Sequence, residues 1–581
     1  MLSNLLSHWR LLTIAILSSI ALMALHVWTG TPAGASYILN LPWFNAFNNA
    51  FWAGDLYPRF SFDFWYGLGG LDFYFYAPLP FWFSATIGQV TCPGCAPHTT
   101  FAVSGAWMVI FAGVSFFVFA RRFFSVPWAG FGGLIYAVLP YHYINDWYWR
   151  QSIGEVLAAV FIPLLALSII RLSAEKKGGA MFAICLAALA VSHLPSFLIG
   201  CHLLALIIVW KIFTREADWR ARAIQVARFA GWGLLGVSLC ALYWIPALGL
   251  LDTVSPEILF SDFANPADWL FFDGRPEPDP FTSLVAKVCL GLVLVLTWCA
   301  YRILRKSEAD RDLKIWIFGP SLFAFLMLTP LAYPIWEYWI LSTVQFPFRP
   351  LVFADLSVGL ATILIAKNFF EKRETVQRRA ALLLSGLAIA AFGVAYAAQA
   401  PKVSEMVRDA KAFDGGFERS GAPEFIPPRM TDRGRVVLNE TAKPGMTSNQ
   451  RYAIFFKAIE QNYLEAEALL DAQAPEVQWQ RPSHNQFTLT ADLDAPRTIS
   501  VPIAAWPYWR AKTANGESLA VGAEADLGLL TVDLPQGQSA VEFYREESGH
   551  ERAGRWLSTL GWLILFGYFA WALLRRKAST A

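Results

Sequence analysis

Apolar stretches recur along the whole chain, and shorter polar or aromatic segments separate them. Many of these stretches reach about 18 to 22 residues, the length that a helix needs to cross roughly 30 Å of hydrocarbon. The pattern therefore predicts an α-helical polytopic membrane protein with about twelve transmembrane helices. The expected spans are 11–28, 100–120, 126–140, 156–170, two that meet at 192–195, 231–250, one that ends at 302, 315–332, one that stops at 367, 380–398 and 556–574.

Basic clusters follow every second expected span. They lie at 121–122, 171–177, 211–228, 302–314, 367–379 and 575–577. Because loops rich in Lys and Arg stay on the cytoplasmic side of a membrane, this alternation places both termini in the cytoplasm. The aromatic loops between the clusters are then expected on the outer side.

The region 399–553 is polar and differs in pattern from the rest. Its second half alternates with the period of a β-strand, and turn signals such as Asn515-Gly516 punctuate it. We expect a small β-rich domain there, with helical structure in 452–472. The run Trp506–Trp509 fits either a cap packed on the outer loops or a glycan-binding surface. The expected domains are a transmembrane domain at 1–398 with a first outer loop at 29–99, an outer domain at 399–553, and a final helix and tail at 554–581.

Composition agrees with this class. The chain is 56% hydrophobic and 15% charged, with a mean hydropathy of +0.42, which is too apolar for a soluble protein of several domains. A net charge of +2 gives no argument for nucleic-acid binding. Cys92 and Cys95 lie in the first outer loop, where a structural disulfide competes with a redox or zinc pair. The histidines are scattered and no metal-ligand motif occurs, so we expect neither a metal nor a cofactor.

The stretch 34–80 is long, aromatic and amphipathic, which suits a folded platform on the membrane surface. We interpret it as the front wall of an active site. Asp55, Arg59 and Asp63 are spaced four residues apart in it, although Pro58 disfavours one continuous helix. Each aspartate is a candidate general base, with Asp63 preferred, and the alternative is mutual neutralisation around Arg59.

A glycine-rich turn, Gly67-Leu-Gly-Gly70, follows these residues. It has neither the strand before it nor the Lys-Ser/Thr after it that a phosphate-binding loop requires. Its glycines fit close backbone packing or substrate approach.

Arg349 lies in a Phe-Pro-Phe-Arg-Pro segment, outside a regular helix interior. A guanidinium on such a turn suits bidentate capture of a phosphate. The alternative is an ion pair with Glu337 or Asp355.

Further ionisable residues near span ends fall on the same outer side, where such groups are functional candidates by default: Asp146, Arg150, Glu155, His193 and Glu337. Arg150 and Glu155 bracket the start of a span and either pair with each other or leave Arg150 to face a phosphate. His193 interrupts two apolar spans and fits either a packed histidine or a substrate contact.

Several motifs occur in an order that resembles a known family. They are Gly54-Asp-Leu-Tyr-Pro-Arg59, Gly67-Leu-Gly69, Phe75-Tyr-Ala-Pro-Leu79, Arg150 with Glu155, Ser192-His193 and Gln345-Phe-Pro-Phe-Arg349. Over most of its length the chain resembles the bacterial membrane family called 6-pyruvoyl-tetrahydropterin-synthase-related, and it looks like a member of the GT-C glycosyltransferase superfamily. The resemblance implies an inner-membrane enzyme that transfers a sugar from a polyprenyl-phosphate carrier to a glycan or lipid acceptor on the periplasmic side.

One departure from the resemblance bears on catalysis. Relatives carry Asp and His in a D-x-x-x-H pattern where this chain has Ser36 and Asn40. Either Asp63 or Asp55 takes the role of the base, or the chain does not catalyse. The expected substrate-binding residues are Tyr57, Arg59, Arg150, Glu155, His193, Gln345 and Arg349.

The expected partners are a polyprenyl-phosphate-linked sugar, its acceptor, membrane lipids and an envelope-assembly protein, with no nucleic acid. The alternative function is a non-catalytic component of polysaccharide assembly or export. A transporter is disfavoured, because the two halves of the chain share no repeated broken helices.

Overall fold

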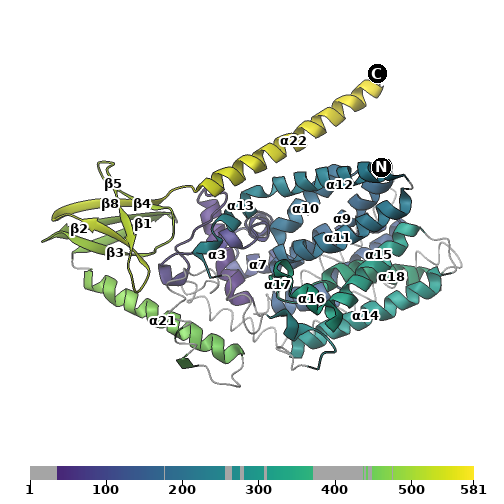
Figure 1. Ribbon diagram of the computed structural model, residues 1–581, viewed down its shortest axis with the longest axis horizontal. Helices are drawn as coiled ribbons and strands as arrows, with labels where there is room; N and C mark the ends of the chain where they lie inside the picture. Colours follow the sequence, from purple (N-terminus) through teal and green to yellow (C-terminus); the bar gives the residue numbers. More distant parts are fainter. Residues whose placement is uncertain are drawn as a thin grey trace.

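The computed structural model describes residues 36–580 except 176, 217, 256–264, 275–279, 306–309, 371–435, 437–439, 442–447, 474–475 and 484. The expected spans 11–28 and 380–398 lie outside the described residues. The rest of the chain folds into a helix bundle and a smaller β domain at one end of it (Figure 1).

The bundle consists of apolar helices joined mostly by short turns. Its main members are α7 (Pro97–Ala120), α8 (Val126–Ala137), α9 (Ile153–Ala174), α10 (Gly179–Ser192), α11 (Leu194–Arg215), α12 (Trp219–Leu239), α13 (Ala241–Gly249), α14 (Pro280–Leu304), α15 (Arg311–Leu328), α18 (Leu351–Phe369) and α22 (Gly549–Thr580). The chain also forms α3 (Tyr37–Trp52) and the short helices α4 (Asp72–Phe75), α5 (Leu79–Phe83), α6 (Gln89–Thr91), α16 (Tyr333–Trp336) and α17 (Trp339–Ser342).

Six helices of the described chain are long and apolar enough to cross a membrane. The number rises to eight if each of two bent pairs counts as one span: α12 with α13, bent by 69°, and α15 with 330–336, bent by 82°. These helices identify a multi-pass membrane protein. The expected total of twelve spans remains a prediction.

The basic clusters at the helix ends gather at the end of the bundle away from the β domain. Arg122, after α7, pairs with Asp310 before α15 at 3.0 Å, and Arg215 at the end of α11 pairs with Asp312 at 2.7 Å. Gln225 of α12 donates to the Ser173 carbonyl at the end of α9 at 3.3 Å. These contacts show that helices far apart in sequence present their polar ends together, as the alternation of basic clusters requires.

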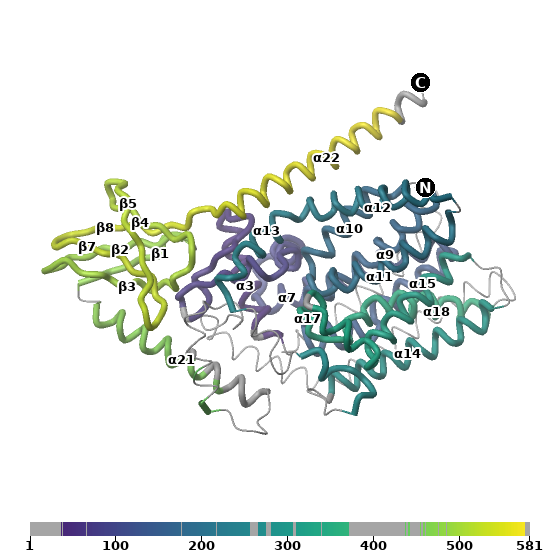
Figure 2. The backbone as a smooth tube through the Cα atoms, in the orientation of Figure 1, coloured from purple at the N-terminus to yellow at the C-terminus, as the bar shows by residue number. Residues whose placement is uncertain are grey.

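The β domain contains two antiparallel sheets, in the order β1-β2-β8-β4-β5 and β3-β7-β6. The strands are β1 (Val477–Ser483), β2 (Gln486–Leu493), β3 (Arg497–Ala504), β4 (Trp509–Thr513), β5 (Ser518–Leu519), β6 (Val521–Ala523), β7 (Leu529–Leu534) and β8 (Gly537–Arg545). Side chains of β2 alternate between buried and more exposed positions, which confirms the predicted strand period. The helix α21 (Ser448–Gln473) lies along the domain (Figure 2), where Gln473 exchanges two hydrogen bonds with the Ser500 backbone.

The glycine turn at 67–70 attaches the platform to the β domain. The carbonyls of Gly67, Leu68 and Gly69 accept hydrogen bonds from Arg481 (2.6 Å), the Ala504 backbone (2.9 Å) and the Trp506 indole (3.1 Å). Gly69 has a φ of +84°, which favours glycine, and a Cβ there would meet the Phe60 ring. The structure therefore favours close backbone packing over substrate approach for these glycines.

The aromatic run of the β domain packs into the same contact. Trp506 is 3% exposed and Trp509 is 1% exposed, and the Trp509 ring packs edge-on against Phe60 at 5.3 Å. Of the two alternatives for this run, the structure supports the cap rather than an open glycan-binding surface, because these two indoles are not accessible.

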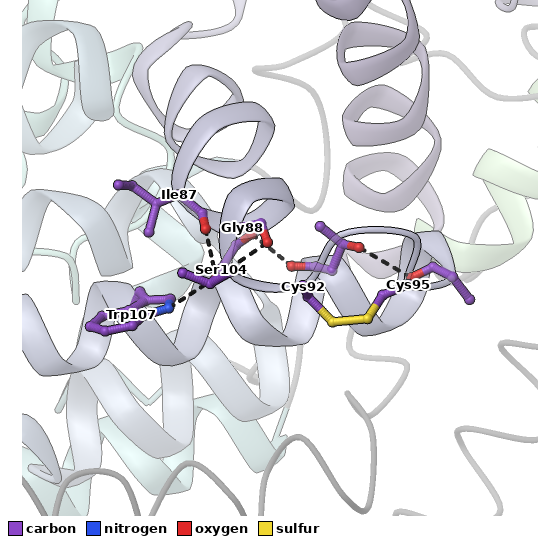
Figure 3. The surroundings of a disulfide bond; sticks show 9 residues. Ile87, Gly88, Cys92, Cys95, Ser104 and Trp107 are labelled. Carbon is purple, nitrogen blue, oxygen red and sulfur yellow. Dashed lines mark hydrogen bonds between the residues drawn. A yellow bond between two sulfur atoms is a disulfide. The ribbon is translucent and has the colours of Figure 1, made fainter.

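Cys92 and Cys95 form a disulfide just before α7, as one of the sequence alternatives expected (Figure 3). The turn is further held by a hydrogen bond from the Cys92 backbone to the Gly88 carbonyl at 3.0 Å. Trp107 of α7 reaches the preceding helix by donating to the Thr91 hydroxyl at 3.2 Å. The disulfide therefore closes the turn that leads from the platform into the first described long helix.

Candidate functional site

The residues expected to form one site fall into two polar groups. Arg150, Glu155 and Arg349 lie together at the ends of bundle helices, and we call their surroundings the Arg150 network. Tyr57 and Arg59 lie instead where the platform meets α22, together with Asp55, and we call this place the Arg59 pocket.

The Arg150 network is built around one buried carboxylate. Glu155 lies in the first turn of α9 and accepts from Arg150 at 3.1 Å and from the Tyr141 hydroxyl at 3.0 Å. Its Oε2 is 3.8 Å from Nε of Arg349. Arg150 also donates to Asp146 at 3.0 Å. Two guanidinium groups therefore converge on two carboxylates that are fully buried.

Arg349 reaches this network because its segment is irregular, as the two prolines around it require. Its Nη1 donates to the Val344 carbonyl. The stacked rings of Phe346 and Phe348 flank the guanidiniums, with Arg150 5.4 and 5.1 Å from the two centroids and Arg349 4.9 Å from that of Phe346. Gln345 begins this segment with a φ of +70°. The ion-pair partner of Arg349 is thus Glu155, and neither Glu337 nor Asp355 takes that place.

The backbone that carries Arg150 is unusual. Residues 140–150 form η3 (Pro140–Arg150), a wide π-helical segment of a kind that is frequent at functional sites. Gln151 ends it in the left-handed region with a φ of +50°. Such strain in a residue other than glycine persists only where the surroundings impose it. Here the Gln151 carbonyl accepts from the Asn40 amide at 2.6 Å.

Ser36 and Asn40, the two positions that depart from the motif expected from sequence, border this segment. The Ser36 N–H donates to the Arg150 carbonyl at 2.9 Å, and Asn40 contacts Gln151 as described. The start of α3 is therefore part of the Arg150 network, although neither residue supplies a charge to it.

A second buried pair, His142 and Asp355, lies beside the Arg150 network. Nδ1 of His142 lies 2.9 Å from Oδ2 of Asp355, which joins η3 to α18. His142 and Arg150 belong to η3, and Arg349 directly precedes α18, so this bond links the segments that carry the two arginines.

His193 takes a structural position beside these residues. Its Nδ1 caps α11 by accepting from the Ser196 N–H at 3.3 Å, and it lies 2.7 Å from the Ser196 hydroxyl. Gly154 permits the approach, because a Cβ there would lie 2.6 Å from the Ser192 carbonyl. Burial and the charges of Arg349 and Arg150 lower the pKa of His193. These contacts correspond to the packed alternative and hold the ring neutral.

Five of the fifteen buried polar side-chain atoms that have no hydrogen-bond partner among the described residues lie in and around this network. They are Oδ1 of Asn40, Nε2 of His142, Oδ1 of Asn145, Oδ2 of Asp146 and Nε of Arg349. Leaving a buried polar atom unsatisfied costs about 1–3 kcal/mol, so such atoms require an explanation. Burial and the nearby Glu155 charge also raise the pKa of Asp146. Perturbed carboxylates in such surroundings are candidates for acid–base chemistry.

The Arg59 pocket is organised by Glu551, in the first turn of α22. Glu551 accepts from Arg59 at 3.2 Å, from the Tyr74 hydroxyl at 2.6 Å and from Arg545 at 2.8 Å. Arg59 also donates to the Leu242 carbonyl at 2.8 Å. The pairing partner of Arg59 is therefore Glu551, and not Asp63 as the mutual-neutralisation alternative supposed.

A pocket of about 640 Å³ opens beside this carboxylate. Asp55, Tyr57 and Arg59 form one wall, and Oδ1 of Asp55 accepts from the Tyr57 N–H at 3.1 Å. Burial raises the pKa of Tyr57 to about 12, which keeps its hydroxyl protonated. Asp63 is exposed and does not line this pocket.

Helix α3 separates the two polar groups. Asn40 contacts the Arg150 network, whereas the Asp55 N–H bonds to the Ala50 carbonyl at 3.0 Å near the other end of the helix. Ten residues of α-helix span about 15 Å, far beyond the roughly 3 Å over which a general base works. Asp55 and the two guanidiniums of the Arg150 network therefore do not form one reaction centre in this arrangement.

No family model matches the sequence, and no curated protein matches it. The solved structures to which the chain shows some likeness include that of the arabinofuranosyltransferase AftD from Mycobacteria (TM-score 0.43, 16% identity), where the match covers 75% of this chain and 29% of AftD. Another is ArnT from Cupriavidus metallidurans bound to undecaprenyl phosphate (TM-score 0.38, 10% identity), where the match covers 90% of this chain and 97% of ArnT. A third is the oligosaccharyltransferase AglB from Archaeoglobus fulgidus with an inhibitory peptide and a dolichol-phosphate (TM-score 0.37, 12% identity), where the match covers 77% of this chain and 59% of AglB.

The match thus spans less than a third of AftD, the first of these proteins. All three TM-scores are below 0.5, so we draw no conclusion about substrate or reaction from them. The arguments that follow use the residues of this chain.

Three residues in and beside the Arg150 network, Tyr141, His142 and Asp355, were missed as site candidates from sequence. Asp146 was named among the ionisable residues near span ends but was not chosen as a site residue. Asp146 lies four residues before Arg150, a spacing that signals an ion pair, so the sequence carried this information. The bond between His142 and Asp355 joins residues 213 positions apart, and no local pattern indicates it. Within the described chain, no group of three His, Cys, Asp or Glu residues is arranged to hold a metal ion.

Proposed function

We propose that this chain is an inner-membrane glycosyltransferase that transfers a sugar from a polyprenyl-phosphate carrier to a glycan or lipid acceptor on the periplasmic side. The observation that carries the proposal is the pair of buried guanidiniums, Arg150 and Arg349, beside carboxylates and unpartnered polar atoms at the ends of membrane helices. Such groups are expensive at membrane depth and are kept there for function.

A phosphate fits this place for three reasons. Two planar guanidiniums offer bidentate donors, and Nε of Arg349 has no hydrogen-bond partner among the described residues. Glu155 marks the first turn of α9, so the positive end of that helix dipole adds to the attraction for an anion. Phe346 and Phe348 cover the guanidiniums on one side and reduce competition from water.

In the proposed reaction, the acceptor hydroxyl gives its proton to Oδ2 of Asp146, which has no hydrogen-bond partner among the described residues. The acceptor oxygen bonds to the anomeric carbon while the bond from that carbon to the phosphate oxygen breaks. The polyprenyl phosphate leaves with the bonding electrons, and Arg150 and Arg349 stabilise its added charge. Asp146 therefore replaces Asp63 and Asp55 in our proposal, because it lies within the network.

Two features support the proposed periplasmic orientation. The basic clusters gather at the end of the bundle away from the β domain, and such clusters mark the cytoplasmic side. The Cys92–Cys95 disulfide lies at the opposite end of α7 from Arg121, and disulfides persist in oxidising compartments such as the periplasm.

A second candidate function is a non-catalytic binder of the lipid carrier. It is favoured by Ser36 and Asn40, which occupy the positions where relatives carry Asp and His. In that case the arginines hold the phosphate and no proton is transferred.

One set of variants tests both functions. Arg349→Lys keeps the charge but removes the two-pronged donor, and we expect it to weaken binding of polyprenyl phosphate by about 10- to 100-fold. Asp146→Asn is expected to leave this binding intact and to lower sugar transfer by about 10²- to 10⁴-fold. Arg510→Lys, at an exposed pair with Glu546 in the β domain, is the matched control.

The outcomes separate the possibilities. Unchanged binding in the Arg349 variant contradicts the phosphate site. Intact binding with no transfer by the wild type, supplied with native lipids and partners, supports the binder. Full transfer by the Asp146 variant refutes the assignment of the base.

A further inference from the structure

The Arg59 pocket has two chemically different ends along one face of α22. Its lining residues on that helix are Glu551, Arg555, Ser558, Thr559, Trp562, Leu563 and Phe566. They recur at intervals of three or four, which places them on one side of a helix. Over about 22 Å of helix this face changes from charged to apolar. The change runs in the direction in which α22 leaves the β domain (Figure 1).

The apolar end belongs to a helix that meets the criteria for a membrane span. Leu563 is 62% exposed and Phe566 is 60% exposed, so their surfaces are open to the surroundings of the helix. Trp562 stands between these residues and the charged end, the position that tryptophan favours at a membrane interface. The pocket therefore begins in the headgroup region and continues toward acyl chains.

The charged end of the pocket carries both positive and negative side chains. Arg59 and Arg545 share the single carboxylate of Glu551, which leaves one positive charge in excess at the inner wall. Asp55 lines the same pocket and supplies a negative charge.

The rim adds the pair Arg555–Glu547, at 2.9 Å and with the Arg555 side chain 62% exposed. An exposed pair of this kind is worth little and rearranges at low cost. The charged end is therefore a balanced set of guanidiniums and carboxylates and has no large excess of either sign.

We propose that the Arg59 pocket binds a zwitterionic phospholipid with a primary ammonium group, phosphatidylethanolamine in its chemistry. The phosphate lies against Arg59, Arg545 and Arg555, the ammonium lies against Asp55 and Glu547, and an acyl chain follows Trp562, Leu563 and Phe566. A volume of about 640 Å³ is within the usual range for a ligand pocket.

The balance of charges selects this headgroup. An anionic headgroup adds negative charge to this balanced set, so that its phosphate and the carboxylates of the pocket share the same guanidiniums, and a quaternary ammonium offers the carboxylates no N–H donor. Ethanolamine supplies three N–H donors beside a phosphate, so both halves of the lining find partners. The inference does not depend on glycosyl transfer, because the pocket lies about 15 Å along α3 from the Arg150 network.

The test is lipid selectivity of the full-length protein, purified in detergent and stripped of native lipid. Native mass spectrometry measures retention of phosphatidylethanolamine, phosphatidylglycerol and phosphatidylcholine with identical dioleoyl chains. We expect phosphatidylethanolamine to bind about tenfold more tightly than either of the others, which corresponds to about 1.4 kcal/mol. Arg555→Gln and Asp55→Asn should each remove this preference, whereas Arg510→Gln, at an exposed pair outside the pocket, should keep it.

Arg555 is exposed, so its variant is expected to fold even if the Asp55 variant does not. Equal binding of the three lipids, as for a non-specific lipid annulus, overturns the proposal. A preference for phosphatidylglycerol overturns the zwitterionic assignment. A preference that survives in the Arg555 variant places the lipid elsewhere and also overturns it.

Discussion

Replacing Gly69 by alanine tests whether the glycine turn holds the β domain on the platform. Gly69 has a φ of +84°, and an added Cβ would lie 2.2 Å from Cζ of Phe60. That ring has little freedom to move, because it packs edge-on against Trp509 at 5.3 Å and against Phe62 at 4.9 Å. The added methyl group therefore pushes on the contact through which the β domain meets the platform.

The magnitude is the sum of two costs. The left-handed backbone costs an alanine about 1–2 kcal/mol, and overpacking costs about 1–3 kcal/mol more. Gly516 is a matched control, because it has the same φ of +84° but nothing within 4 Å of an added Cβ. Gly516→Ala thus reports the backbone cost alone, and the difference between the two variants, about 1–3 kcal/mol, reports the contact.

The assay is thermal unfolding in detergent followed by tryptophan fluorescence, to which Trp506 and Trp509 contribute as two of the 25 tryptophans of the chain. One kcal/mol shifts the midpoint by about 4–8 °C in a domain of 60–100 residues. We expect Gly69→Ala to unfold at least about 4 °C below Gly516→Ala. Equal midpoints would show that Phe60 yields freely and that this packing does not hold the domain.

Two further predictions concern topology and pH. In intact cells, a membrane-impermeant maleimide should label Cys92 and Cys95 once their disulfide is reduced. A cysteine introduced by Lys177→Cys should react only after the cells are permeabilised. The reverse labelling pattern refutes the proposed membrane orientation. Folding lowers the pKa of His193. Below about pH 6.5 the unfolded chain therefore binds a proton at this residue that the folded chain does not bind, and the free energy of unfolding decreases as the pH falls. The unfolding midpoint should fall between about pH 7 and about pH 5 in the wild type and fall less in His193→Gln, and equal losses contradict this role.

The periodic parts of the fold were predictable from sequence. The helix α7 and the strand β2 appear where apolar length and alternation indicated them, because such patterns depend only on local geometry. The bends between α12 and α13 and after α15 were not predicted, since an apolar stretch does not reveal where a helix turns. The cap role of Trp506 was left open, because it depends on a partner more than 400 residues earlier in the chain.

The candidate site was predictable residue by residue but not as an assembly. A pair between Arg150 and Glu155 was one of two alternatives left open, and the two side chains do pair at 3.1 Å. Arg59 was expected in the same site, yet its partner Glu551 lies 492 residues further along the chain. Sequence identifies which polar groups are costly near a membrane, but only the packing of helices decides which of them meet.

Ser36 occupies the position where the resemblance leads us to expect an aspartate, and its contacts show what this difference changes. Its N–H bonds to the Arg150 carbonyl, so position 36 borders the segment that carries Asp146. With Ser36, Asp146 and Glu155 face two guanidiniums, and the Asp355 carboxylate is paired with His142. A further carboxylate at position 36 would exceed the available cations, and repulsion between like charges would raise the pKa of at least one acid. The carboxylate that position 36 lacks is thus matched by Asp146 in the neighbouring segment. Loss of a motif residue does not by itself imply loss of a base, and the charge balance around Arg150 and Arg349 is what the Asp146 variant tests.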